Sequence, residues 1–358
     1  MPPQEAAGPL VPALNLATAY HQDLDDVAPT RYGRWEHDSA ASLEEVLGVI
    51  EGGTAVVFNS GMAAISAVLM TFLMPGDALV VGADTYYETR QIADQLRERG
   101  VEVRAIGDVA GQLPQAVVGA RLVLLESPTN PLMRIHDLHE CARLSHEAGA
   151  LFAVDNSMSS PLGQRPLSIG ADLVLTSDAK VVGGHNDIIL GHVSGRDPSL
   201  MERLRLWRHL HGSIPSAFDC WLTRRSIGTL ELRYERQSAN AAALTDLLHQ
   251  RPEVTHLRWP GWKLDPGHAI AARQMTGGGG VLSFRLPGRD YLHRFLKASS
   301  LIVPATSYGG LQTMANDIAT WPHITVPPGF VRIACGCEPT NDLVEDVRHA
   351  LDAALPMS

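Results

Sequence analysis

Short apolar segments alternate with longer mixed stretches over the first half of the chain. The apolar segments between residues 54 and 191 are too short for buried helices and are typical of strands covered on both faces of a sheet. They predict strands at Thr54–Phe58, Ala78–Val81, Val101–Ile106, Arg121–Leu125, Leu151–Val154 and Ala171–Leu175. Because segments with helical periodicity separate these strands, the pattern predicts an α/β fold with a mostly parallel sheet.

The stretches between the strands carry helix signals. Ser42 and Glu45 have the spacing of a capping box, which predicts a helix over Ser39–Ile50. Further helices are expected at Ala63–Phe72, Asp84–Arg99 and His136–Ala148.

A second, smaller domain is expected in the last third of the chain. Residues 201–248 have a helical pattern rich in arginine, and the strand candidates Val254–Trp259, Val281–Leu286 and Phe330–Ala334 follow them. The proline-rich start of the chain is weakly patterned and cannot form a core alone. We therefore predict an N-terminal arm at 1–38 that contacts a neighbouring subunit, a large domain at 39–246 and a small C-terminal α+β domain at 247–358.

Composition narrows the possible partners. The chain has 358 residues, 45% of them apolar, and a formal net charge of −10 without a run of Lys and Arg, which argues against nucleic-acid and membrane partners. Four scattered cysteines favour reduced thiols, and no apolar segment is long enough to cross a membrane, so we expect a cytoplasmic protein. Cys335 and Cys337 lack the second ligand pair that zinc needs, and no metal is expected.

Polar residues follow two of the predicted strands. Asp155 comes directly after Leu151–Val154, and Ser177 and Lys180 come shortly after Ala171–Leu175. In an open α/β sheet, ligands bind just beyond the carboxyl ends of the strands, so these side chains are expected at one edge. We predict that Lys180 binds pyridoxal 5′-phosphate (PLP) as a Schiff base and that Asp155 faces its pyridine nitrogen.

A candidate phosphate site lies where a strand is followed by a helix. Ser60, Gly61 and Met62 precede the helix Ala63–Phe72, and small residues at a helix start let backbone N–H groups approach an anion. Each residue alone has an ordinary structural explanation, such as a helix cap for Ser60 or a surface position for Lys180. Their occurrence together, in this order, favours the PLP site.

Several motifs stand in a defined order along the chain: Tyr32-Gly33-Arg34, Ser60–Ala64, Tyr86, Glu126–Pro131, Asp155-Asn156, Ser177–Lys180, Gly184–Asp187, Ser307–Gly309 and Arg332. This order resembles that of the Cys/Met-metabolism PLP-dependent enzymes, the trans-sulfuration family, from about Leu16 to Leu351. The resemblance implies the aspartate aminotransferase-like fold (fold type I). It also implies a homotetramer built from dimers that share active sites.

The resemblance also implies roles for individual residues. Tyr32 and Arg34 would reach the cofactor phosphate of the neighbouring subunit, Tyr86 would stack on the PLP ring, and Asn130 would lie near its 3-oxygen. With Ser307 and Asn130, the guanidinium of Arg332 would bind an amino-acid substrate, holding its α-carboxylate.

The implied activity is a PLP-dependent carbon–sulfur lyase reaction with Lys180, Tyr86 and Asp155 as catalytic residues. Bacterial cystathionine γ-lyases, which form cysteine, 2-oxobutanoate and ammonia, are the most similar subgroup. The same residues would serve a γ-synthase, a methionine γ-lyase or a specialised lyase or synthase acting on a related thioether or O-activated homoserine, so these alternatives stay open. Departures from the family pattern occur at Trp35–Ser39, Glu88, Ala179 and Thr306, of which Glu88 adds bulk and charge near the expected substrate entrance.

Overall fold

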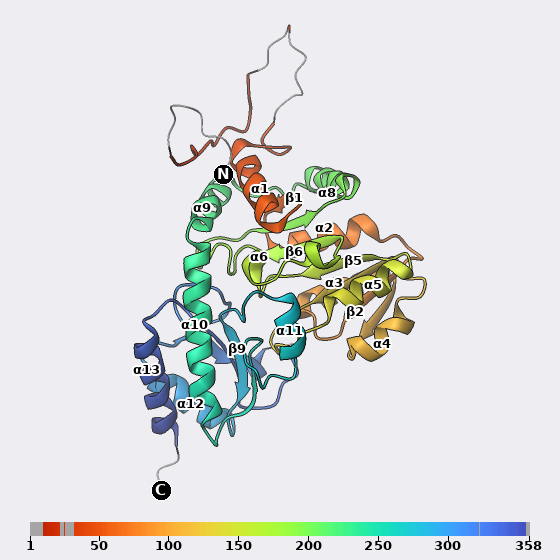
Figure 1. Cartoon of the computed structure of the whole chain (residues 1–358). Helices are drawn as coiled ribbons and strands as arrows, with labels where there is room; N and C mark the ends of the chain where they lie inside the picture. Colours follow the sequence, from red (N-terminus) through yellow and green to blue (C-terminus); the bar gives the residue numbers. More distant parts are fainter. Residues whose placement is uncertain (1–9, 22–24, 26–31, 322, 356–358) are drawn as a thin grey trace.

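Two β-sheets, each covered by helices, make up most of the molecule. The computed structural model describes residues 10–21, 25, 32–321 and 323–355, and Figure 1 shows one sheet in the upper part and the other below it. The long helix α10 (Leu230–His249) runs from the upper part into the lower one. The limits of the arm and of the two domains stay predictions, and part of the arm lies outside the described residues.

The larger sheet has the predicted mostly parallel arrangement. Within the described residues its strand order is β1-β7-β6-β5-β4-β2-β3, and only β7 runs antiparallel to its neighbours. The strands are β1 (Thr54–Phe58), β2 (Ala78–Gly82), β3 (Glu102–Ile106), β4 (Leu122–Glu126), β5 (Leu151–Asp155), β6 (Leu173–Ser177) and β7 (Gly191–Gly195).

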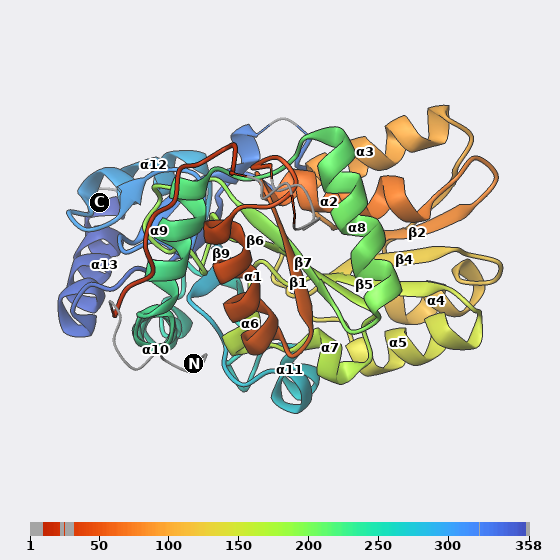
Figure 2. The same cartoon turned by 90° about the horizontal axis from the view of Figure 1, so that it is seen from above.

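Helices cover both faces of this sheet, as Figure 2 shows. One face packs against α2 (Gly61–Phe72), α3 (Tyr87–Glu98) and α8 (Pro198–His211). The opposite face packs against α1 (Asp38–Glu51), α4 (Val109–Ala116), α5 (Leu138–Glu147), the short α7 (Pro166–Ile169) and α9 (Ala217–Ile227). The short helix α6 (Ser160–Gly163) follows β5. Strands buried on both faces in this way explain the short, continuous apolar segments of the sequence.

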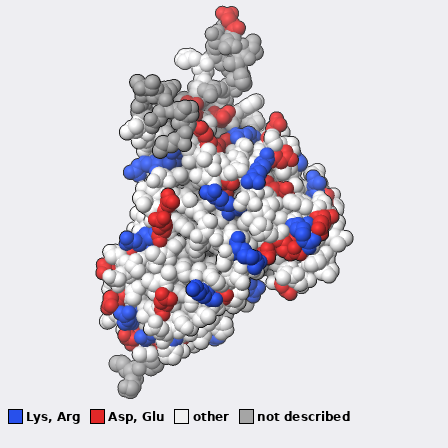
Figure 3. Space-filling view, in the orientation of Figure 1, with Lys and Arg blue, Asp and Glu red and all other residues white. Residues whose placement is uncertain are grey.

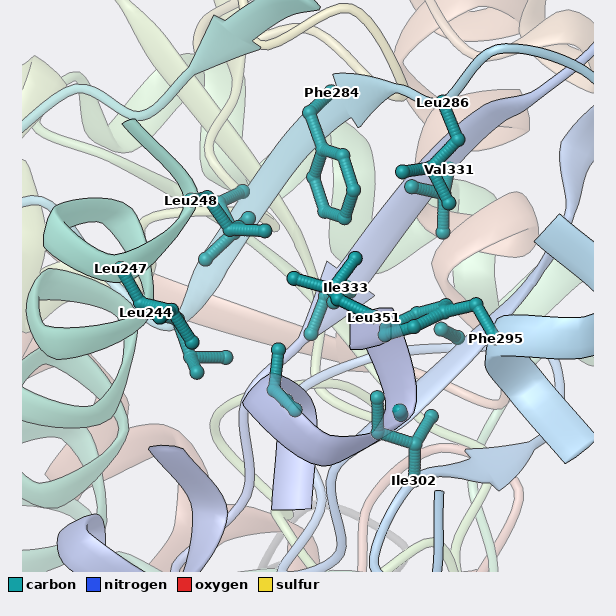
Figure 4. Packing of buried hydrophobic residues seen from close by; sticks show 14 of the residues in the cluster. Leu244, Leu247, Leu248, Phe284, Leu286, Phe295, Ile302, Val331, Ile333 and Leu351 are labelled. Carbon is teal, nitrogen blue, oxygen red and sulfur yellow. The ribbon is translucent and has the colours of Figure 1, made fainter. Parts of the chain in front are cut away.

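The second sheet encloses its own core. Its strands are β8 (Thr255–Arg258), β9 (Val281–Arg285), β10 (Val303–Pro304), β11 (Met314–Asp317) and β12 (Phe330–Ala334), in the order β10-β11-β12-β9-β8. The helices that come after α10 are α11 (His268–Gln274), α12 (Arg289–Ala298), the 3₁₀ turn η1 (Ile318–Thr320) and α13 (Thr340–Ala354). Figure 4 shows side chains of β9, β12 and α12 packed together with leucines of α10.

Some local predictions are wrong. Helix α1 begins at Asp38, and its cap is His37, whose Nδ1 accepts a hydrogen bond from the N–H of Ala40 at 3.1 Å. Ser42 and Glu45 therefore lie inside the helix and form no capping box. Strand β6 begins two residues later than expected, and β7 was not predicted at all because its glycines, histidine and serine have little intrinsic preference for strands.

On the face that Figure 3 shows, Lys and Arg side chains are scattered among Asp and Glu side chains, and they form no large basic area. No helix in the described part of the chain is long and apolar enough to cross a membrane.

A buried histidine connects three elements next to the segment that carries Lys180. His192 of β7 lies between two carboxylates, with Nδ1 at 2.8 Å from Asp178 and Nε2 at 3.2 Å from Glu51, and all three side chains are fully buried. Burial lowers the pKa of His192, but the carboxylates of Asp178 and Glu51 outweigh it and raise the pKa to about 10. The protonated ring therefore joins α1, β7 and the Lys180 segment.

We expect the contribution of this ring to the free energy of unfolding to be lost in alkaline solution. Since the pKa rises from an ordinary 6.5 to about 10 on folding, the stabilisation is complete below pH 6.5 and is lost as pH rises through 10. Urea unfolding between pH 6 and 10 should show that the difference in free energy of unfolding between the wild type and His192→Gln decreases as pH rises. His146→Gln is the matched control, because His146 is half-exposed and pairs with a single carboxylate of the described residues, that of Asp172. If the difference in free energy of unfolding between the wild type and His192→Gln stays constant with pH, the ring of His192 is not charged in the folded protein.

Candidate active site

A cavity of about 610 Å³ lies beyond the carboxyl ends of β5 and β6 and receives residues from both sheets. Most of the site residues predicted from the sequence line it, namely Ser60, Gly61, Met62, Tyr86, Asn130, Asp155, Ser177, Lys180, Ser307 and Arg332. The topology explains this convergence, because parallel strands end at the same edge of a sheet. Glu126 at the end of β4 pairs in register with Asp155 at the end of β5.

One end of the cavity is built for an anion. Ser60 caps helix α2, and its Oγ accepts a hydrogen bond from the N–H of Ala63 at 3.0 Å, which leaves the preceding N–H groups of Gly61 and Met62 without intrahelical partners. A Cβ on Gly61 would lie 2.7 Å from the Cβ of Ser177, so the close approach of these two segments requires glycine. Backbone amides at a helix start and a serine hydroxyl favour a phosphate group.

Asp155 is one of two buried carboxylates that line the cavity, the other being Glu126. Oδ1 of Asp155 accepts a hydrogen bond from the N–H of Ser157 at 3.0 Å, and the hydroxyl of Ser157 in turn accepts one from the N–H of Ser177 at 2.7 Å. Burial raises the pKa of Asp155, while the hydrogen bonds from Ser157 and the charge of Lys180 oppose the increase. Such a carboxylate is stabilised by a cationic partner such as a protonated ring nitrogen.

Lys180 lies in the segment between β6 and β7, where its N–H donates to the carbonyl of Ser177 at 3.1 Å. Burial lowers the pKa of its amine and the charge of Arg332 lowers it further, while the carboxylates of Asp155 and Glu88 partly oppose the decrease. Nζ lies 5.6 Å from the centre of the Tyr308 ring. A buried amine with a lowered pKa is a better nucleophile and base than a surface lysine.

Arg332 reaches the cavity from β12 of the second sheet. Its guanidinium donates to Oδ1 of Asn130 at 2.6 Å and to the carbonyl of Ser307 at 2.7 Å, and it lies 5.3 Å from the centre of the Tyr308 ring. The side chain is 3% exposed, and its Nε has no hydrogen-bond partner among the described residues. A buried guanidinium with an unused donor is suited to bind a carboxylate.

Tyr86 immediately precedes helix α3. Glu126, which is buried, accepts hydrogen bonds from the N–H groups of Tyr86 at 2.7 Å and of Asn130 at 3.1 Å, and so holds both segments beside the cavity. Burial raises the pKa of the Tyr86 hydroxyl, and the carboxylate of Glu88 raises it further. The Tyr86 hydroxyl therefore stays protonated and can donate a hydrogen bond.

Three residues of the site were not assigned a role from the sequence. Tyr308, Glu126 and Ser157 organise Lys180, Tyr86 and Asp155 respectively. Tyr308 and Glu126 stand inside the motifs Ser307–Gly309 and Glu126–Pro131, which was the available signal. No sequence signal pointed to Ser157, because its hydrogen bonds connect the ends of two strands, β5 and β6.

Tyr32 and Arg34 do not line this cavity. Tyr32 is 44% exposed, and the guanidinium of Arg34 donates to the carbonyl of His209 at 3.1 Å. A role at the site of a neighbouring subunit stays a prediction for both residues.

The groups of the cavity fit PLP. Its phosphate matches the N–H groups at the start of α2 that have no intrahelical partner, where only glycine fits against Ser177, and its pyridine nitrogen matches the buried carboxylate of Asp155. Its aldehyde carbon matches the buried amine of Lys180.

Comparisons with known proteins support the same conclusion. The family model described as Cys/Met metabolism PLP-dependent enzyme matches residues 2–352. The chain is 41% identical to a Streptomyces coelicolor protein named "Putative cystathionine gamma-lyase", over 96% of this chain and 89% of that one. It is 36% identical to the cystathionine gamma-synthase of Escherichia coli, over 98% of this chain and 95% of that one.

A solved structure extends the similarity to the fold. The crystal structure of cystathionine gamma synthase from Xanthomonas oryzae pv. oryzae in complex with aminoacrylate and cysteine matches with a TM-score of 0.93 at 33% identity, covering 98% of this chain and 95% of that one. The fold-type-I architecture is therefore confirmed. The chain belongs to the Cys/Met-metabolism family of PLP-dependent enzymes.

Proposed function

We propose that this protein is a cystathionine γ-lyase, which converts L-cystathionine into L-cysteine, 2-oxobutanoate and ammonia. The observation that carries the proposal is that Lys180 Nζ and the Arg332 guanidinium lie beside one ring, that of Tyr308, at 5.6 and 5.3 Å. A nucleophilic amine and a carboxylate-binding cation thus meet in a cavity large enough for an amino-acid thioether. The choice of reaction within the family follows the relative with 41% identity.

The residues that would hold PLP lie at three places in the cavity. Backbone groups of Gly61 and Met62, with the hydroxyls of Ser60 and Ser177, would bind the phosphate. Asp155 would bind the pyridine nitrogen, and Lys180 would bind the aldehyde carbon covalently. Bound PLP supplies an electron-withdrawing ring that stabilises negative charge on the substrate Cα.

The protein side chains orient the substrate and move its protons. Arg332 would bind the α-carboxylate and so fix the direction of the Cα–H bond, with Asn130 and Ser307 holding the guanidinium in place. Neutral Nζ of Lys180 would accept the Cα proton, since burial and Arg332 both lower its pKa. The protonated hydroxyl of Tyr86 would donate to the sulfur that leaves the γ-carbon.

A γ-replacement reaction is the second candidate, because the Escherichia coli relative and the Xanthomonas structure carry that name. It would use the same side chains up to the loss of the γ-substituent, after which a thiol adds at the γ-carbon. The two reactions differ in which substrate the cavity admits and in whether a thiol adds once the leaving group has departed.

Product analysis separates these reactions. We expect the purified protein with L-cystathionine to release L-cysteine and 2-oxobutanoate, which a keto-acid assay and a thiol assay measure. Homocysteine with pyruvate would instead identify cleavage at the β-carbon. Formation of cystathionine from an O-acyl homoserine and cysteine, without release of 2-oxobutanoate from cystathionine, would replace the proposed lyase with a synthase.

The role of Lys180 can be tested cleanly because the chain contains only three lysines, Lys180, Lys263 and Lys297. Lys180→Ala should lose the visible absorption of covalently bound PLP and reduce kcat by roughly 10²–10⁴-fold or more, the contribution of a positioned base. Lys297→Ala, on the exposed side of α12, is the control and should retain both. Retention of the absorption by Lys180→Ala would assign the cofactor to another lysine.

We further propose a cytoplasmic homotetramer whose dimers share active sites. Exposed apolar side chains lie on the arm and on the helices near it: Tyr32, Trp35, Leu206, Leu210 and Phe218. Ile189, which lines the cavity, is also 68% exposed, so the cavity has an uncovered apolar side. A second subunit would cover these groups and bring its Tyr32 and Arg34 to the phosphate end. The four free cysteines fit a reducing compartment.

Mixed subunits test this arrangement. Arg34→Ala should weaken PLP retention, measured as the PLP concentration that restores activity after dialysis. Dimers mixed from Arg34→Ala and Lys180→Ala chains should contain one site with both native residues and recover tight PLP retention. Mixed dimers that are no more active, and retain PLP no more tightly, than either variant alone would contradict a site shared between subunits.

A further inference from the structure

Glu88 places a carboxylate in the cavity that the roles described above do not use. It lies in the first turn of α3 and lines the cavity together with Tyr87, Thr306 and Trp321. The phenol of Tyr87 donates to its Oε1 at 3.2 Å. Its negative charge also raises the pKa of the Tyr86 hydroxyl, so the carboxylate lies close to two phenols and to the reacting end of the cavity.

The two cations of the cavity are assigned to groups other than Glu88, although the charge of Glu88 does act on Lys180 and raises its pKa. Lys180 and Arg332 are the cations among the lining residues, and the proposed function uses both, the first for PLP and the second for the α-carboxylate. Asp155 is likewise used by the pyridine nitrogen, and Glu126 by two backbone N–H groups. Within the described residues, no ion pair joins Glu88 to a basic side chain.

We propose that Glu88 binds an ammonium group carried by the γ-substituent of the substrate, and that it thereby selects L-cystathionine among γ-substituted amino acids. The inference rests on the proposed function and names the substrate feature that the same cavity recognises. Glu88 acts as a specificity-determining residue, in contact with the part of the substrate that leaves.

The chemistry of the competing substrates agrees with this assignment. The leaving half of cystathionine is itself an α-amino acid, and its amine is protonated at neutral pH. A methylthio group offers no charge to Glu88, and a succinyl ester offers a carboxylate that Glu88 repels. A charge-assisted hydrogen bond inside a cavity is stronger than one on an open surface, because fewer water molecules compete for it.

A matched pair of substrates isolates the ammonium group. S-(2-carboxyethyl)-L-homocysteine is L-cystathionine with hydrogen in place of the distal amino group, and both would release 2-oxobutanoate. For the wild type we expect kcat/KM for cystathionine to exceed that for the deaminated compound by about tenfold, the value of one charged hydrogen bond. In Glu88→Gln, which preserves shape and removes charge, the ratio should fall close to one. Glu98→Gln, on the exposed end of the same helix, should keep the wild-type ratio.

Two outcomes would overturn the proposal. An unchanged ratio in Glu88→Gln would show that the carboxylate does not contact the ammonium group. An equal loss with both compounds would show that Glu88 acts through the neighbouring hydroxyl of Tyr86.

Failure of the proposed function would have a different signature, because the wild type would then release 2-oxobutanoate from neither compound. Apparent dissociation constants of the two compounds compare wild type and Glu88→Gln separately from turnover when they are measured by rapid mixing, from the change in visible absorption of the PLP-loaded protein before product accumulates. A preference for cystathionine that Glu88→Gln abolishes supports the proposal, and equal preferences in the two proteins contradict it.

Discussion

The adjacent carboxyl ends of β4, β5 and β6 are the constraint on which the site depends. Parallel pairing forces the last residues of these strands, Glu126, Asp155 and Ser177, to one edge of the sheet. Neither carboxylate can be fully hydrated there, so each is stabilised by nearby N–H groups. Those hydrogen bonds in turn fix the segments that carry Tyr86, Asn130 and Ser157.

The second sheet completes the cavity with a cation. Arg332 extends from β12 toward the larger sheet, where Asn130 accepts its hydrogen bond. Its charge, together with burial, lowers the pKa of Lys180. A guanidinium from one sheet therefore adjusts the protonation of an amine on the other. The relation of the two sheets is thus part of the chemistry. Helix α10 connects them, because its Arg233 donates hydrogen bonds to the carbonyls of Val181 and Val182 beside Lys180 while the helix packs against β9 and α13.

Buried charge outside the cavity supports the Lys180 segment. His192 connects Asp178, two residues before Lys180, with Glu51 at the end of α1. Removing one member of such a group leaves an uncompensated buried charge, which is costly. The segment carrying the reactive amine is therefore connected to the helix that comes after the N-terminal arm.

The sequence by itself determined the α/β class, most strand positions and the residues expected around PLP, because strand patterns and short motifs are local properties. It failed for the cap of α1, where His37 replaces the expected Ser42 through contacts with Ala40 and with Pro215, far away in the chain. It also failed for β7, because this strand is stabilised by its hydrogen bonds to β1 on one side and β6 on the other. Only the tertiary structure decided that Lys180 and Arg332 share the ring of Tyr308 and that no ion pair joins Glu88 to a basic side chain of the described residues. Both facts depend on distances between segments remote in the sequence, and local patterns carry no such distances.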